Sequence, residues 1–302
     1  MFAGPQEAWR KMKPPRLEIT TPDSLPAALA VLAAGGPDAR LLAGGQSLVP
    51  MLAMRLAAPA LLVDLNRISE LAGIAADGEG GWTAGSMTRQ RELERSRLVA
   101  ERHPLLAAAL PWIAHLPIRN RGTLGGSLAH ADPAAELPAV CLASDACIEM
   151  AGPAGRRVLP AERFFLGVFE TALQPGEILA AVKFPSWPAA RRWGFGEMAR
   201  RRGDFALCGV ALTADRGRDG RIAAARIVAF GIGDRPLRLD AVEDALLGRV
   251  PVPDTLAAAA RLAPRAVRPR SDHHASAEYR SELLAVLCRR SLEQAFPAGE
   301  ET

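Results

Sequence analysis

The chain has 302 residues, of which 49% are hydrophobic and 23% charged, and its net charge is +4. This length fits two or three subdomains, on the usual scale of roughly 100–200 residues per domain. The weak, dispersed charge and the 5% aromatic content argue against a nucleic-acid-binding protein. No charge-free stretch approaches the roughly 20 apolar residues of a membrane span, and residues 1–16 contain no apolar signal-peptide core. We therefore expect a cytoplasmic protein.

Strands and helices alternate in the first part of the chain. Ser24 is expected to cap a helix that Gly35-Gly36 ends. The apolar patterns that follow predict a buried strand at 39–42, a helix at 48–56 and a second strand at 60–65. Together they form a compact α/β unit in which a glycine turn separates the first strand from the helix.

A second unit follows, with a strand near 82–85 and helices at 88–96 and 98–110. Asp132-Pro133 predicts the start of another helix, because Asp caps free N–H groups and Pro suits the first helical position. A strand at 178–184 closes this unit before a linker that contains Pro185 and Pro188.

The remaining sequence predicts a different domain, with strands at 193–199, 206–214 and 225–230 and helices at 239–247, 255–262 and 276–296. The last helix is expected to dock on the sheet through one face that includes Tyr279, Leu283, Val286, Leu287 and Arg290. The four cysteines show no Cys-x-x-Cys spacing and are read as small core residues. No histidine spacing indicates a metal site.

Two glycine-paired segments carry the strongest functional signal, Ala43-Gly44-Gly45-Gln46-Ser47-Leu48 and Thr123-Leu124-Gly125-Gly126-Ser127-Leu128. One such segment alone is usually an ordinary turn. Two in matched context can converge on one diphosphate, because glycine allows close backbone approach and lets consecutive N–H groups point at phosphate oxygens. A dinucleotide is therefore the leading ligand. The P-loop pattern is absent, and the Gly194-to-Ala199 match to the Rossmann pattern follows no apolar strand.

These segments carry a resemblance to a known family. The stretches involved are residues 41–51, Val63-Asp64-Leu65, residues 118–138, Arg200-Arg201-Arg202-Gly203-Asp204-Phe205-Ala206-Leu207 and Ala275-Ser276-Ala277-Glu278-Tyr279-Arg280. In this order they resemble the FAD-binding subunit of the molybdenum hydroxylases. That family includes the medium subunit of aerobic carbon monoxide dehydrogenase and the flavin domain of xanthine dehydrogenase. The resemblance covers roughly residues 16–296.

The resemblance implies an α+β fold. It comprises a two-part α/β FAD-binding domain of the PCMH or vanillyl-alcohol-oxidase type, followed by a C-terminal domain of antiparallel sheet packed with helices. We place the FAD-binding domain at 1–187, with subdomains at about 14–66 and 67–187, and the C-terminal domain at 188–298.

The resemblance also implies which residues bind FAD. Ser47, Thr123 and Ser127 would supply hydroxyl groups to the diphosphate, and Glu136 matches a carboxylate position near the nucleotide. Asp132 is read mainly as a helix cap that lies near the ligand. The full set of expected cofactor-binding residues is Leu42, Ala43, Gly44, Gly45, Gln46, Ser47, Leu48, Ile113, Thr123, Gly125, Gly126, Ser127, Asp132, Glu136 and Leu179. No side chain is expected to act as a catalytic acid or base.

Two positions depart from relatives. Gln46 stands where some related flavoproteins carry a histidine that attaches FAD covalently, so we expect non-covalent FAD. Gly196 stands where xanthine dehydrogenase-like members carry a lysine, so their contacts at the flavin edge do not transfer to this chain.

The implied function is electron transfer within a heteromeric complex. A large molybdopterin subunit would oxidise the substrate, and a small subunit would relay electrons through [2Fe–2S] clusters. The FAD of this chain would pass them to an acceptor such as a quinone, NAD or oxygen. The expected assembly is a dimer of heterotrimers. Two alternatives remain: a self-contained FAD-dependent reductase of the same fold, and a non-catalytic nucleotide-binding or assembly protein.

Overall fold

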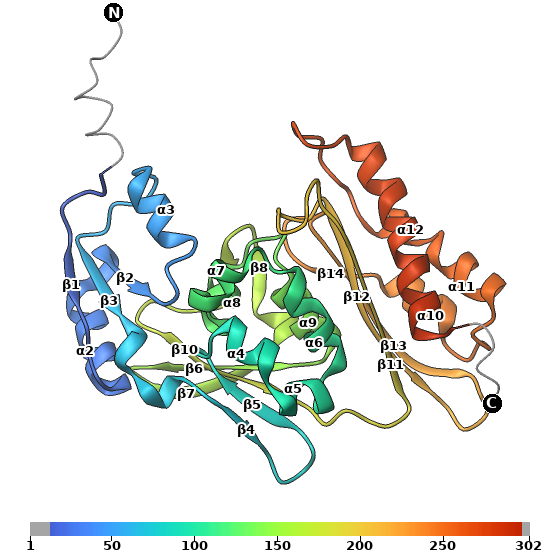
Figure 1. The fold of residues 1–302 in the computed structure, drawn as a ribbon, viewed down its shortest axis with the longest axis horizontal. Helices are drawn as coiled ribbons and strands as arrows, with labels where there is room; N and C mark the ends of the chain where they lie inside the picture. Colours follow the sequence, from blue (N-terminus) through green and yellow to red (C-terminus); the bar gives the residue numbers. More distant parts are fainter. Residues whose placement is uncertain (1–12, 298–302) are drawn as a thin grey trace, which may run out of the picture.

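The computed structural model describes residues 13–297, so most of the N-terminal stretch used in the signal-peptide argument lies outside the described residues. Three main sheets follow one another along the chain, from the N-terminal unit through a central unit to the C-terminal sheet (Figure 1). Within the described part of the chain, no helix is long and apolar enough to cross a membrane.

The N-terminal unit is a small parallel sheet in the order β1–β3–β2, formed by Glu18–Thr20, Leu61–Asp64 and Ala39–Leu42. Helix α2 (Leu25–Gly35) packs on it through the buried Leu25, Ala28 and Leu32. Helix α3 (Leu48–Ala53) follows β2 and is shorter than the sequence predicted. The expected order of strand, glycine turn, helix and strand is otherwise confirmed.

The central sheet is antiparallel and has the order β4–β5–β10–β6–β7. Its strands span Ile74–Ala76, Trp82–Gly85, Ile178–Phe184, Cys147–Gly152 and Gly155–Pro160. The predicted strands 82–85 and 178–184 are therefore neighbours, whereas β6 and β7 were not predicted. A two-stranded ribbon, β8 (Phe165–Gly167) with β9 (Glu170–Thr171), lies between β7 and β10 in the chain.

The helices between β5 and β6 are α4 (Gln90–Arg95), α5 (Arg97–Arg102), α6 (Pro104–Ala109), α7 (Leu116–Arg121), α8 (Leu124–His130) and α9 (Glu136–Ala143). The predicted continuous helix at 98–110 is wrong. His103 leaves the helical conformation, and its Nδ1 accepts the N–H of Leu106, so that a new helix begins at Pro104.

The predicted helix start at Asp132-Pro133 is also wrong. Asp132 accepts the N–H of Ala134 at 2.9 Å, and its carbonyl accepts the N–H of Ala135 at 3.0 Å. These bonds close a local turn, and the helix begins only at Glu136. An Asp side chain can satisfy a nearby backbone N–H in a turn as well as in a cap, and here the turn is formed.

The C-terminal sheet is antiparallel in the order β11–β12–β13–β14, from Arg191–Met198, Cys208–Arg216, Ile222–Phe230 and Leu237–Arg238. Helices α10 (Asp240–Leu246), α11 (Pro253–Ala260) and α12 (Ala277–Ala295) cover one face (Figure 1). The docking of α12 is confirmed through Leu283 and Leu287, but Tyr279, Val286 and Arg290 are exposed. Cys141, Cys208 and Cys288 are buried in the core as expected, and Cys147 is half-buried.

The other face of this sheet packs against the helices of the central unit. Thr213 on β12 donates a hydrogen bond to the carbonyl of Ala143 at 2.7 Å, and the N–H of Gly231 donates to the carbonyl of Pro133 at 2.8 Å. Phe195 on β11 stacks on Phe230 in the same core cluster. The segment between α8 and α9 is thus held by both domains.

Candidate functional site

The first glycine segment is an open loop between β2 and α3. Gly45 has φ +73, a left-handed conformation that glycine adopts without steric cost, and its carbonyl accepts the N–H of Val49. The backbone N–H groups of residues 44–48 donate no hydrogen bond to any other part of the described chain. The hydroxyl of Ser47 likewise makes no capping bond to α3. Five consecutive donors and one hydroxyl are therefore available to a ligand.

The second glycine segment is the start of a helix. Thr123 is the N-cap of α8, and its Oγ1 accepts the N–H of Gly126 at 3.0 Å. The N–H of Gly125 donates to the carbonyl of Ser86 at 2.7 Å, and the N–H of Ser127 donates to the carbonyl of Thr123. Most backbone donors of this segment are already used. It can offer a ligand its hydroxyl groups and the positive end of the helix.

The two segments touch each other. A Cβ atom added to Gly44 would lie 2.4 Å from the carbonyl oxygen of Arg121, and one added to Gly126 would lie 3.3 Å from the Cβ of Ala43. Larger residues would push the segments apart at both positions. The structure therefore brings Ala43 to Leu48 and Thr123 to Ser127 together, as a pair of loops around one diphosphate requires.

A polar network that sequence reasoning missed fastens the two segments. The amide of Asn66 donates to the carbonyl of Ala43 at 3.0 Å, and Arg89 donates both to the Asn66 amide oxygen and to the carbonyl of Arg121. Burial and then the charge of Arg121 lower the pKa of Arg89 from its usual value. Asn66 directly follows the Val63-Asp64-Leu65 stretch, which was the available signal for this position.

Three of the predicted residues, Leu42, Ile113 and Leu179, have apolar side chains. Leu42 is the last residue of β2 and is half-buried. Ile113 and Leu179 are 7% and 4% exposed and belong to one core cluster. The carbonyl of Ile113 accepts a hydrogen bond from Arg119 at 2.8 Å, and Arg119 in turn pairs with Glu94. This anchor fixes the backbone at Ile113.

The two predicted acidic residues differ in burial. Asp132 lies in the turn before α9 and uses its carboxylate on Ala134. Glu136 opens α9 and is 8% exposed, and burial raises its pKa to about 7. The charge of Asp132 raises that pKa further, whereas its own backbone N–H and the charge of Arg119 oppose the rise. Glu136 is thus a carboxyl that holds its proton far more readily than an exposed glutamate.

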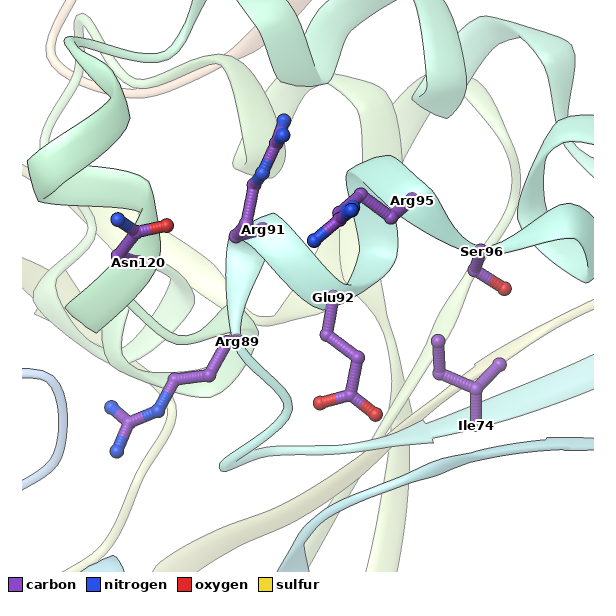
Figure 2. Close-up of a pocket in the computed structure, with 7 residues that line it drawn as sticks. All are labelled: Ile74, Arg89, Arg91, Glu92, Arg95, Ser96 and Asn120. Atoms are coloured by element: carbon purple, nitrogen blue, oxygen red, sulfur yellow. The ribbon is translucent and has the colours of Figure 1, made fainter.

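A surface depression of about 680 Å³ lies beside α4. Figure 2 shows Arg89 just before α4, Arg91 and Arg95 on α4, and Asn120 on the neighbouring helix α7. Its lining residues are Ile74, Arg89, Arg91, Glu92, Arg95, Ser96 and Asn120. None of these is a predicted site residue, and only Arg89 connects the depression to the glycine segments.

Two family models cover most of the chain. Residues 15–187 match the model of the FAD binding domain in molybdopterin dehydrogenase, and residues 193–295 match that of the CO dehydrogenase flavoprotein C-terminal domain. The chain belongs to this family. It is an FAD-binding oxidoreductase subunit of the molybdenum hydroxylase type, as the sequence resemblance predicted. The predicted α+β fold with a C-terminal flavoprotein domain is confirmed as well.

Relatives match along nearly their whole length. The 6-hydroxypseudooxynicotine dehydrogenase complex subunit alpha of Paenarthrobacter nicotinovorans is 39% identical, over 96% of this chain and 98% of its own. The carbon monoxide dehydrogenase medium chain of Hydrogenophaga pseudoflava is 36% identical, over 94% and 99%. A solved structure of carbon monoxide dehydrogenase from Hydrogenophaga pseudoflava superimposes with a TM-score of 0.91 at 38% identity, covering 94% of this chain and 99% of the matched chain.

The geometry fits the cofactor of the family. Free backbone donors at residues 44–48 and the helix N-terminus at Thr123 suit a doubly charged diphosphate. At Gly44, a Cβ would meet the neighbouring segment, so the cradle exists only with glycine there. The residues present therefore fit FAD.

Proposed function

We propose that this chain is the electron-transfer subunit of a heteromeric molybdenum hydroxylase. Its FAD would accept electrons from [2Fe–2S] clusters on a small partner and deliver them to an external acceptor. A large partner would oxidise the substrate at a molybdopterin centre. The support comes from relatives that are named as a medium chain or as a subunit of a dehydrogenase complex and that match this chain almost end to end. The expected assembly is a dimer of heterotrimers.

The observation that carries the proposal is the set of unused donors in the first glycine segment. Gly44 to Leu48 would bind the diphosphate through their N–H groups, and the hydroxyl groups of Ser47, Thr123 and Ser127 would add side-chain bonds. Gly126 would leave room for this approach, whereas the buried Gly125 would act by packing on Ser86. Leu42 and Ala43 complete the wall of the cradle.

Ile113, Leu179 and Glu136 would border the rest of the cofactor, with Asp132 holding the turn before α9. The Gln46 amide donates to the carbonyl of Gly44 at 2.9 Å, so its role would be to shape the loop. We expect FAD to be bound without a covalent link, since glutamine offers no nucleophile for one. When bound, FAD supplies the change between one-electron and two-electron transfer.

The same proposal includes a division of the chain at the Pro185–Pro188 region. The FAD-binding domain would occupy 1–187, in parts of about 14–66 and 67–187, and the C-terminal domain 188–298. The support is a core cluster built only from residues of the C-terminal part, between Leu207 and Phe296. Limited proteolysis should cut first near this linker, and first cleavage inside β10 or β11 would contradict it.

The decisive experiment is purification of the tagged chain from its native cells. We expect one co-purifying chain with two [2Fe–2S] clusters and one larger chain with molybdopterin. Acid precipitation of the complex should release FAD into the supernatant. Substrate should then bleach the flavin of the complex. A chain that purifies without either partner and whose flavin is rapidly bleached by NADPH would instead establish a self-contained reductase. Bleaching by NADH alone does not distinguish the two, because NAD is one of the acceptors expected for the subunit.

A further inference from the structure

The loop between β11 and β12 carries three consecutive arginines that the FAD site does not use. This arginine loop comprises residues 199–207, and Arg200, Arg201 and Arg202 are all exposed. Phe205 in the same loop is 72% exposed, more than any other large apolar side chain of the described residues. Aromatic rings and arginines are the side chains most often found at the centre of protein interfaces.

The arginine loop is held in place by the segment that precedes α12. The buried Arg280 of α12 donates to the carbonyl of Leu207 at 2.6 Å and pairs with Asp272 at 2.7 Å. Nη1 of Arg200 lies 3.4 Å from Nδ1 of the exposed His274. The segment before α12 therefore lies beside the arginine loop, at the same end of the C-terminal sheet (Figure 1).

The other side of the arginine loop rests on the part of the FAD-binding domain that contains Ile113. A Cβ atom added to Gly203 would lie 2.5 Å from the ring of His115, so the two backbones meet closely there. The guanidinium of Arg202 lies 5.4 Å from the centre of the Trp112 ring, as in a cation–π contact. The loop thus connects an exposed surface to residues that the proposed function places beside the cofactor.

The exposure and charge of this surface indicate the kind of ligand. Neither the depression beside α4 nor a smaller one of about 50 Å³ beside Arg238 includes a residue of the arginine loop. Small ligands are usually bound in concave pockets, whereas this loop presents exposed side chains, so it fits a macromolecule better. Three arginines outnumber the exposed Asp204 and Glu278, and the complementary surface is therefore acidic.

The chemistry of the arginine loop favours a transient partner over a permanent subunit. Permanent subunit interfaces are large and rich in apolar side chains, whereas encounters between redox proteins are small and guided by charge. The loop has one strongly exposed apolar ring among three cations. We propose that it docks an acidic electron-carrier protein, which takes electrons from the FAD of this chain. The inference rests on the proposed function, in which the FAD delivers its electrons to an external acceptor.

The electron count fits a one-electron carrier. Two molecules of the carrier would take the two electrons of one fully reduced FAD in turn, and its two protons would be released to the solvent. Each encounter then has to end before the next one begins. A small interface guided by charge suits this requirement, because its contacts form quickly and dissociate quickly.

The test compares two charge forms of one carrier. Native cytochrome c is basic, and succinylation of its lysines makes it acidic while it keeps the same haem. The purified complex is reduced with one equivalent of dithionite per FAD without oxygen, and haem reduction is followed by stopped flow. We expect the acidic form to be reduced at least about tenfold faster at low salt. This preference should disappear at about 0.5 M salt, where the charges are screened.

Arg201→Glu is the decisive variant, because the exposed Arg201 side chain makes no hydrogen bond or ion pair with another described residue. It should slow reduction of the acidic form at least about fivefold and leave the basic form no slower. Arg218→Glu is the matched control, since it makes the same charge change on the exposed turn at the opposite end of β12. Equal slowing in both variants, or no slowing in Arg201→Glu, would overturn the docking site.

Co-purification separates the remaining outcomes. A tagged Arg201→Glu chain should still bring down its iron–sulfur partner, and loss of that partner would place the loop in a permanent interface and overturn the inference. Binding of the wild-type complex to phosphatidylglycerol vesicles that is lost in Arg201→Glu would overturn it in favour of a membrane surface. A wild-type chain that carries no flavin and co-purifies with no partner would overturn the proposed function itself.

Discussion

The two glycine segments have similar sequences but different structures. Residues 44–48 form a loop whose N–H groups are free, whereas Thr123 to Ser127 begin a helix whose N–H groups are mostly bonded to Thr123, Ser86 and Thr88. The first segment supplies donors, and the second supplies a close-packed wall with a helix N-terminus. A repeated pair of glycines therefore does not mean a repeated function, because the hydrogen bonds around each pair decide what remains for a ligand.

The largest effect is expected at Gly45. Gly45→Val should weaken FAD binding at least about 100-fold, since a β-branched residue is strained at φ +73 and its Cβ would lie 3.0 Å from Val49. The FAD-to-protein ratio after gel filtration measures the loss. Gly155→Val is the control, because Gly155 has φ +105 in open space away from the segments. Equal FAD loss in both variants would mean that strain alone, rather than the position, causes the effect.

Gly125→Ala should change stability more than binding. The added Cβ would lie 2.4 Å from the Cβ of Ser86, so we expect a loss of about 1–3 kcal/mol in the free energy of unfolding. Urea denaturation measures this value. Gly126→Ala is the matched comparison. Its Cβ would lie 2.7 Å from Oγ1 of Thr123 and 3.3 Å from the Cβ of Ala43, so it should reduce FAD affinity more than Gly125→Ala does. A reversed ranking would contradict the division of roles within the second segment.

Asn66→Ala tests the network between the segments. It removes the bond to the carbonyl of Ala43 and one acceptor of Arg89, at a cost of about 1 kcal/mol. FAD affinity should fall about fivefold, measured by quenching of flavin fluorescence. Asn120→Ala alters the neighbouring surface depression without touching this network and should bind FAD normally. Unchanged affinity in Asn66→Ala would show that the loops hold their positions without it.

The smallest expected effects distinguish the hydroxyl groups of Thr123 and Ser47. Thr123→Ala removes the N-cap of α8 and should lower stability by about 1 kcal/mol, whereas Ser47→Ala should leave stability unchanged because Ser47 makes no capping bond. Ser47→Ala should instead weaken FAD binding about threefold. Thermal unfolding and FAD titration on both variants measure the difference. A stability loss in Ser47→Ala would show that the first loop needs its hydroxyl to fold.

The sequence predicts that the two glycine segments lie together, but it does not predict which conformation each segment adopts. Glycine where the backbone must approach closely is a local signal, and residues 43–48 and 123–128 carry it. The helical state of Gly125 and Gly126 was missed because glycine disfavours helices by about 1 kcal/mol relative to alanine. Here the cap at Thr123 and the packing of Gly125 on Ser86 outweigh that preference.

Other predictions failed where residues far apart in the sequence determine the local structure. Asp132 fits both a cap and a turn, and the turn is fixed in part by the bond from Gly231 to Pro133. The burial of Glu197 gives no signal in its own strand, because the FAD-binding domain that covers this face of β11 comes from a distant part of the sequence. Tyr279 and Val286 were placed on the docking face of α12, but the buried stripe includes Arg280, which binds the carbonyls of Leu207 and Gly231.

The bonds from Thr213 to Ala143 and from Gly231 to Pro133 have a consequence for biosynthesis. The turn that carries Asp132 and the helix that begins at Glu136 are held by residues synthesised much later, 70 residues later in the case of the bond from Thr213 to Ala143. A nascent chain that ends before β11 lacks these contacts. We therefore expect the chain to acquire its flavin after translation rather than during it, and a ribosome-stalled chain without the C-terminal sheet to remain colourless.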